Sequence, residues 1–119
     1  VNQIESHPTF QQAALAQKSR DHGIAVEAYS PLGQGRDLGN EVVAELADRH
    51  GATPAQLVLA WHLGLGNIVI PKTVSPERMR ENLAAARIKL SSADLERISA
   101  LEAGNRIGAD PAVAAFTQL

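Results

Sequence analysis

The chain has 119 residues, enough for one modest domain, and its net charge of −2 without a basic tract argues against a nucleic-acid partner. It contains no cysteine, which excludes disulfides and thiolate chemistry and is compatible with a reducing cytoplasm. No apolar run approaches the roughly 18–20 residues that a membrane span requires, so we expect no membrane insertion.

The chain opens on a predicted strand, residues 1–5, in which apolar and polar residues alternate. This strand ends before Pro8, because a residue that precedes proline is displaced from helical conformations. Thr9 and Gln12 have the spacing of a capping box and open a predicted helix over residues 10–21. Because the sequence begins inside a strand and lacks an initiator methionine, we expect it to be a piece of a longer protein.

A second predicted strand, residues 24–29, is followed by a turn rich in glycine and proline at residues 30–35. Asn40 can cap the next predicted helix, residues 41–50. A more apolar helix over residues 54–63 follows a second capping box, and proline occupies its first helical position.

The stretch from residue 67 onward combines a strand, a basic turn and a helix start. Residues 67–70 predict a buried strand, and Lys72 follows its carboxyl end, where α/β folds place ligand sites. Ser75 can cap a helix that begins at Pro76 and carries Arg78 in its first turn. The two cations near a helix N-terminus indicate a phosphate site. Solvated surface cations are the alternative.

This helix has two predicted faces. Arg78, Glu81 and Asn82 share one of them. Met79 and Leu83 form an adjacent apolar stripe, which we expect to dock the helix on the sheet.

Ser91 begins a further capping box and opens the last predicted helix, residues 92–103. Strands that alternate with helices of this length predict right-handed crossovers and a parallel sheet, hence an α/β fold. Three parallel strands leave two unpaired edges. Either partners or strands outside this sequence are expected to cover them.

Five segments resemble the C-terminal part of an aldo-keto reductase. They are VNQIE, AYSPLGQG, HGATPAQLVLAWHL, NIVIPKTVSPERMRENL and LSSADLERISALEAGNRIGADP. Together they cover nearly the whole chain in the expected order, and their wording is most similar to small bacterial reductases of the 2,5-diketo-D-gluconate reductase type. The resemblance implies that residues 1–119 form the last three β/α units of a single (β/α)8 barrel domain, with an extra C-terminal helix.

The resemblance also implies an NADPH site. It places Gln3 on the nicotinamide carboxamide, Tyr29 against the nicotinamide ring and residues 30–35 along the pyrophosphate. Residues near Lys72 and Arg78 would surround the 2′-phosphate, and two cations there favour NADPH over NADH. The implied cofactor-binding residues are Gln3, Tyr29, Ser30, Pro31, Leu32, Gly33, Gln34, Gly35, Lys72, Thr73, Val74, Arg78, Glu81 and Asn82.

The catalytic Asp, Tyr, Lys and His of the family lie on its earlier strands, so the resemblance implies that none is in this chain. The complete protein would reduce a small aldehyde or ketone. The four histidines, His7, His22, His50 and His62, share no metal-ligand spacing, so we expect no metal site. We expect His62 to be a packed structural residue and Trp61 to belong to the core.

A second hypothesis is a non-catalytic module that binds a nucleotide or self-associates through its open sheet edges. The mass of the intact protein separates this module from part of a reductase.

Overall fold

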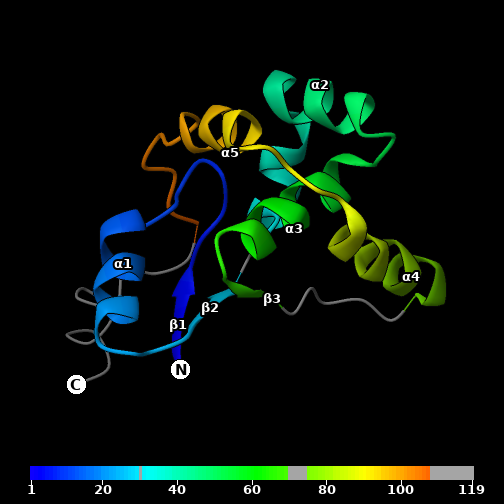
Figure 1. Cartoon of the computed structure of the whole chain (residues 1–119). Coiled ribbons are helices and arrows are strands. Elements are labelled where there is room, and N and C mark those ends of the chain that lie inside the picture. The colour runs from blue at the N-terminus through cyan, green and yellow to red at the C-terminus, as the bar shows by residue number, and fades with distance from the viewer. Residues whose placement is uncertain (30, 70–74, 108–119) are drawn as a thin grey trace.

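The computed structural model of the chain describes residues 1–29, 31–69 and 75–107. Within these ranges three strands, β1 (Asn2–Glu5), β2 (Val26–Tyr29) and β3 (Ile68–Val69), form one sheet in the order β1-β2-β3 (Figure 1). The α-helices are α1 (Ala13–Asp21), α2 (Glu41–Arg49), α3 (Pro54–Gly64), α4 (Pro76–Ala84) and α5 (Ser92–Ser99). Two 3-10 helices are η1 (Gly33–Gly39) and η2 (Ala85–Arg87).

The sheet is parallel, as the alternation of strands and helices predicts. β1 pairs with β2 from Asn2 opposite Val26 to Glu5 opposite Tyr29. β2 pairs with β3 through only two residues of each strand. The α/β class with a small parallel sheet is therefore confirmed.

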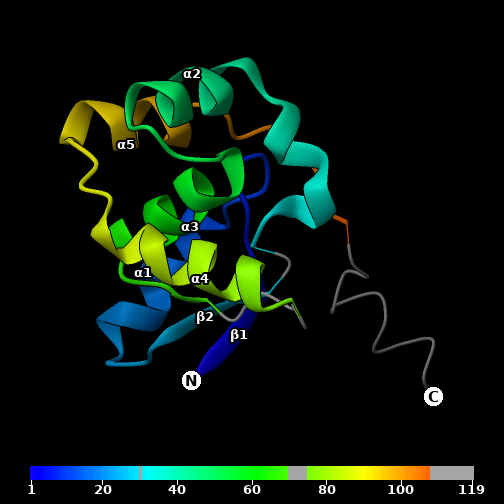
Figure 2. The same ribbon diagram turned by 90° about the vertical axis from the view of Figure 1, so that its right-hand side faces the viewer.

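The main hydrophobic core lies among helices and not on the sheet. Its buried members come from α2, α3 and α5: Val43, Leu46, Ala47, Leu57, Val58, Trp61 and Ile98. Figure 2 shows α2 and α5 together on one side of α3, with the strands on its other side. The expectation that Trp61 is a core residue is confirmed, because its side chain is fully buried. A smaller cluster joins Ile4, Ala16 and Val26 where α1 covers the sheet.

Two of the three predicted capping boxes are present, and they fix the starts of α3 and α5. The Thr53 hydroxyl accepts from the Gln56 backbone N–H at 3.1 Å, and the Gln56 side chain accepts from the Thr53 N–H at 2.9 Å. Ser91 and Asp94 exchange the same pair of hydrogen bonds. Both boxes satisfy amide groups that a helix N-terminus leaves without partners.

The predicted capping box at Thr9 and Gln12 is wrong. α1 begins at Ala13, its N-cap is Gln12 with a positive φ of 51°, and no side chain caps it. The Thr9 hydroxyl instead donates to Asp37 Oδ1 at 2.8 Å. A contact across 28 residues therefore outweighs the local cap.

The predicted docking of Met79 and Leu83 on the sheet is only partly realised. Both side chains line a cavity together with residues of β3 and α3, but Met79 is 52% exposed and Leu83 is 74% exposed. The described ranges contain no helix that is both long and apolar enough to cross a bilayer.

Candidate functional site

The two faces of the sheet differ in polarity. Successive side chains of a strand point to opposite faces, and the face that carries Ile4, Val26 and Ala28 is buried. Its opposite face carries Gln3 and Tyr29, both exposed. Gln3 donates from Nε2 to Glu27 Oε1 on the neighbouring strand at 3.1 Å. Tyr29 ends β2 with its side chain 41% exposed, so a flat aromatic ring is accessible at the carboxyl edge of the sheet.

The turn after β2 contains the 3-10 helix η1, where the sequence predicted only a loop rich in glycine and proline. Leu32 packs against the main core. Gly33 and Gly35 have φ values of 61° and 86°, which favour glycine. A Cβ at Gly35 would meet nothing within 4 Å, so its backbone borders open space.

His62, on α3, contacts this turn through a hydrogen bond. It is fully buried, and its Nε2 hydrogen bond to the carbonyl oxygen of Pro31 is 2.9 Å long. Nδ1 lies 3.1 Å from the side-chain amide of Asn67, whose oxygen accepts from Arg20. Burial lowers the pKa of His62 to about 4, although the hydrogen bond to Pro31 acts in the opposite direction. His62 is therefore the packed structural residue that the sequence predicted, and its lowered pKa keeps it uncharged near neutral pH.

A second buried histidine joins the turn to the end of β1. His7 Nδ1 is 2.9 Å from Asp37 Oδ2, and His7 Nε2 is 2.9 Å from Glu5 Oε2. All three side chains are nearly inaccessible to water. The two ring nitrogens of His7 thus bridge the carboxyl groups of Asp37 and Glu5.

Sequence patterns offer little sign of this cluster. Glu5 and His7 are two residues apart at a strand end, which is a weak signal that their side chains are neighbours. Asp37 is 30 residues from His7, and no motif connects them. Nowhere in the described ranges do three or more His, Asp or Glu side chains form a group suited to a metal ion.

The predicted phosphate-binding helix carries its cation at the surface. Arg78 is exposed in the first turn of α4, where its backbone N–H donates to the Ser75 hydroxyl at 3.5 Å. A cation at a helix N-terminus opposes the helix dipole. Glu81 is exposed, and its carbonyl oxygen accepts from Gln56 Nε2 at 3.0 Å.

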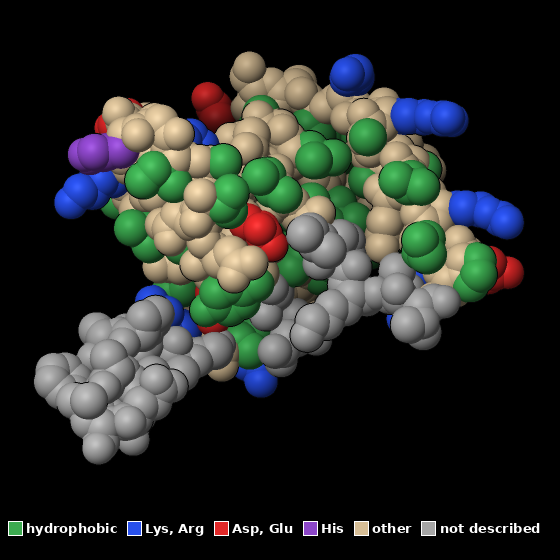
Figure 3. Space-filling model, turned by 90° about the horizontal axis from the view of Figure 1, so that it is seen from below, with side chains coloured by type: hydrophobic (Ala, Val, Ile, Leu, Met, Phe, Trp, Pro, Cys, Tyr) green, Lys and Arg blue, Asp and Glu red, His purple; other side chains and the backbone are tan. Residues whose placement is uncertain are grey.

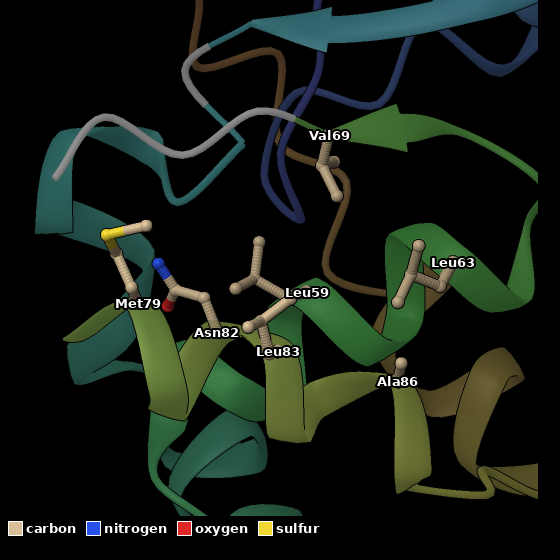
Figure 4. A pocket seen from close by; sticks show the side chains of 7 residues that line it. All are labelled: Leu59, Leu63, Val69, Met79, Asn82, Leu83 and Ala86. Carbon is tan, nitrogen blue, oxygen red and sulfur yellow. The ribbon is translucent and has the colours of Figure 1, made fainter. Parts of the chain in front are cut away.

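Asn82 borders a cavity of about 390 Å³ between α4, α3 and β3 (Figure 4). Val69 points into it from β3, and Leu59 and Leu63 point into it from α3. Met79 and Leu83 line its α4 side. Asn82 thus faces an apolar cavity.

Several predicted site residues lie outside the described residues. Ser30, Lys72, Thr73 and Val74 belong to this group, as does Ile70 at the end of the third predicted strand. The side chain of Gln34 is also not described, although its backbone belongs to η1. The cations predicted to share one phosphate are therefore represented here by Arg78 alone among the described residues.

Comparison with known proteins identifies the class of protein. A model of the Aldo/keto reductase family matches residues 1–103. The chain belongs to the Aldo/keto reductase family.

Two bacterial reductases are similar to nearly the whole of this chain. An aldo-keto reductase of Mycolicibacterium smegmatis is 49% identical over 98% of this chain and 42% of that protein. Methylglyoxal reductase DkgA of Salmonella typhimurium is 45% identical over 93% of this chain and 41% of that protein.

Two solved structures are also similar to this chain. A Gox0644 mutant in complex with NADPH is similar with a TM-score of 0.89 and 46% identity, covering 93% of this chain and 41% of that one. An aldo/keto reductase from Brucella melitensis has a TM-score of 0.78 and 42% identity, covering 85% of this chain and 38% of that one. The chain thus spans less than half the length of the relatives it matches.

Proposed function

We propose that residues 1–119 are the C-terminal, cofactor-binding part of an NADPH-dependent aldo-keto reductase. In this proposal β1, β2 and β3 are the last three strands of an eight-stranded β/α barrel. The chain covers 42% and 41% of two proteins that it matches, a share that suits one part of such a barrel. The outer edges of β1 and β3 would then pair with strands that belong to the rest of the barrel.

The observation that carries the proposal is the polar face of the sheet. Inward-facing and outward-facing side chains alternate along barrel strands, and ligand sites lie at the carboxyl ends. Tyr29 ends β2 with an accessible ring on this face, and Gln3 lies on the adjacent strand. An aromatic face suits a nicotinamide ring, and a Gln side chain can both donate to and accept from its carboxamide.

The phosphate groups of the cofactor are assigned to two segments. The open space beside Gly35 supports the turn 30–35 as the site of the pyrophosphate, since backbone can approach the phosphates closely there. Arg78 supports the 2′-phosphate site. The helix dipole makes a cation unfavourable in the first turn of α4, and a bound phosphate would stabilise it there. The remaining assigned residues are Lys72, Thr73 and Val74 for the same phosphate, and Glu81 and Asn82 for the adenine.

When bound, NADPH supplies the hydride that reduces an aldehyde or ketone to an alcohol. The residues of this chain hold and orient the cofactor. Tyr29 would fix which face of the nicotinamide meets the substrate, and the turn 30–35 would hold the pyrophosphate. The proton donor is assigned to the part of the barrel outside this chain.

The test is a calorimetric titration of the full-length protein with NADPH and with NADH, followed by an assay with methylglyoxal. We expect NADPH to bind at least about tenfold more tightly than NADH, and methylglyoxal to cause loss of NADPH absorbance. Equal affinity for the two cofactors would contradict the 2′-phosphate site. No binding of either would contradict the function.

The exposed apolar residues favour a second candidate, a self-associating module. Ile68, Met79 and Leu83 are large and exposed, and hydrophobic side chains are spread over the face seen from below (Figure 3). Light scattering on the 119-residue chain would give twice the 12.6 kDa mass of one chain if this module forms a dimer. An Ile68→Lys variant would then be monomeric, because a charge on an edge strand opposes strand pairing.

A further inference from the structure

The cluster of Glu5, His7 and Asp37 ties two segments of the site together. Asp37 Oδ2 accepts from the backbone N–H of Thr9 at 2.9 Å and lies 2.9 Å from His7 Nδ1. Asp37 Oδ1 accepts from the Thr9 hydroxyl at 2.8 Å. On the other side of the imidazole, Glu5 is the last residue of β1. These contacts fix the position of the Asp37 carboxylate relative to the sheet.

The same carboxyl group lies close to the first glycine of η1. A Cβ at Gly33 would lie 2.9 Å from Asp37 Cγ, so the side of Gly33 that faces Asp37 has no room for a side chain. The start of the turn is therefore held twice. His62 holds the carbonyl oxygen of Pro31, and Asp37 supports Gly33. Between these supports and the end of η1 lies Gly35, which is exposed and borders open space.

The charges show that this cluster acts indirectly. The Asp37 and Glu5 side chains are carboxyl groups and both are buried, so neither is placed to contact a pyrophosphate. A carboxylate beneath an anion-binding turn would repel the anion unless its charge is offset. Donation from the Thr9 N–H and hydroxyl supplies that offset, and the His7 ring 2.9 Å away helps to fix the geometry.

We propose that His7 and Asp37 are positioning residues that hold residues 31–35 of the turn in the conformation that receives the cofactor's pyrophosphate. The inference rests on the proposed function of that turn. It assigns these residues no contact with the cofactor or the substrate. It also separates the pyrophosphate site from the 2′-phosphate site, because Arg78 lies on α4 and takes no part in the described contacts of this cluster.

The experiment uses the full-length protein and two probes, NADPH and 2′-AMP. 2′-AMP carries the 2′-phosphate but has no pyrophosphate. The variants are Asp37→Ala, which removes all three contacts, and Thr9→Val, which removes only the hydroxyl donor and keeps the side-chain shape. The control is His50→Ala, because His50 Nε2 makes a comparable contact with Asp94 Oδ2 at 3.0 Å away from the turn. Thermal unfolding of each protein sets a titration temperature at which all are folded.

We expect Asp37→Ala to raise the Kd of NADPH about tenfold and Thr9→Val about threefold. The Kd of 2′-AMP should stay unchanged in both variants, and His50→Ala should leave both affinities unchanged. A purely structural role would weaken both probes together or neither, and either result would overturn the inference. If Asp37→Ala does not fold, the Kd values of NADPH and 2′-AMP for Thr9→Val test the inference in the same way. A wild-type protein that binds neither probe would overturn the proposed function and this inference with it.

Discussion

His62 lies beneath the turn after β2, with its Nε2 hydrogen bond to the carbonyl oxygen of Pro31 at 2.9 Å. A carbonyl can only accept, so Nε2 carries the proton and Nδ1 of the neutral ring accepts from Asn67. Arg20 donates to the Asn67 oxygen and thereby directs the Asn67 amide nitrogen toward the ring. Protonation of Nδ1 would set two donors against each other in a buried site, which agrees with the lowered pKa of His62.

This arrangement predicts an acid-sensitive fold. The pKa of His62 falls from 6.5 in the unfolded chain to about 4 in the folded one, so the unfolded state binds a proton first as the pH falls. Stability should decrease below pH 6.5, and the loss attributable to His62 should reach about 2–3 kcal/mol near pH 4.5. Urea unfolding of wild type and His62→Gln at pH 7 and pH 4.5 measures it. Gln can still donate to Pro31 but does not titrate.

The His62→Gln variant should be less stable than wild type at pH 7, since it fills the site less well, and its stability should change less with pH. The change in unfolding free energy between pH 7 and pH 4.5 is compared for the two proteins, and the difference isolates His62 from the other groups that titrate in this range. An equal change in both proteins would contradict the role of His62.

The elements that the sequence predicted are those with local causes. The Thr53 and Ser91 capping boxes involve side chains three residues from the groups they satisfy, and both are present. The strands follow from short alternating or apolar runs between turn residues, and all three occur, with β1 and β2 slightly shorter than predicted. The prediction that the third strand is buried is wrong, because Ile68 is 42% exposed. Local hydrogen bonding and hydrophobic periodicity were therefore sufficient for most of the fold.

The parts that the sequence missed depend on distant contacts. Thr9 has the correct spacing for a cap, but its hydroxyl donates a hydrogen bond to Asp37, which is distant in the sequence. Leu83 was expected to pack on the sheet but is 74% exposed. A local sequence pattern does not specify which distant residues a side chain contacts. The individual cofactor residues came from a family resemblance, because a Tyr at a strand end or an Arg in a first helical turn has many possible roles.

Arg78 should determine cofactor preference. Arg78→Ala is expected to raise the Kd of NADPH at least about tenfold, because a charge-assisted contact with the 2′-phosphate is lost. The Kd of NADH should barely change. Arg80→Ala is the matched control, since Arg80 is also exposed on α4 but points about 200° away around the helix. Equal weakening of both cofactors by Arg78→Ala would remove the 2′-phosphate assignment.

Tyr29 should act through its ring and not through its hydroxyl. Tyr29→Ala removes the aromatic face and should weaken NADPH binding and lower turnover, with about 1 kcal/mol lost from stacking. Tyr29→Phe keeps the ring and should behave like wild type. Steady-state kinetics and calorimetry on the full-length protein measure both effects. A Phe variant as impaired as the Ala variant would show that the hydroxyl matters instead.

Gly33 and Gly35 should differ in their tolerance of a side chain, although both have positive φ. Alanine at either position incurs the strain of a left-handed conformation, about 1–2 kcal/mol. At Gly33 the new Cβ would also lie 2.9 Å from Asp37 Cγ, whereas at Gly35 it would meet nothing within 4 Å. Overpacking at Gly33 should add about 1–3 kcal/mol to the loss. Urea unfolding of the two Ala variants should therefore give a clearly larger loss for Gly33→Ala, and equal losses would mean that the Asp37 carboxylate moves aside without resistance from His7 and Thr9.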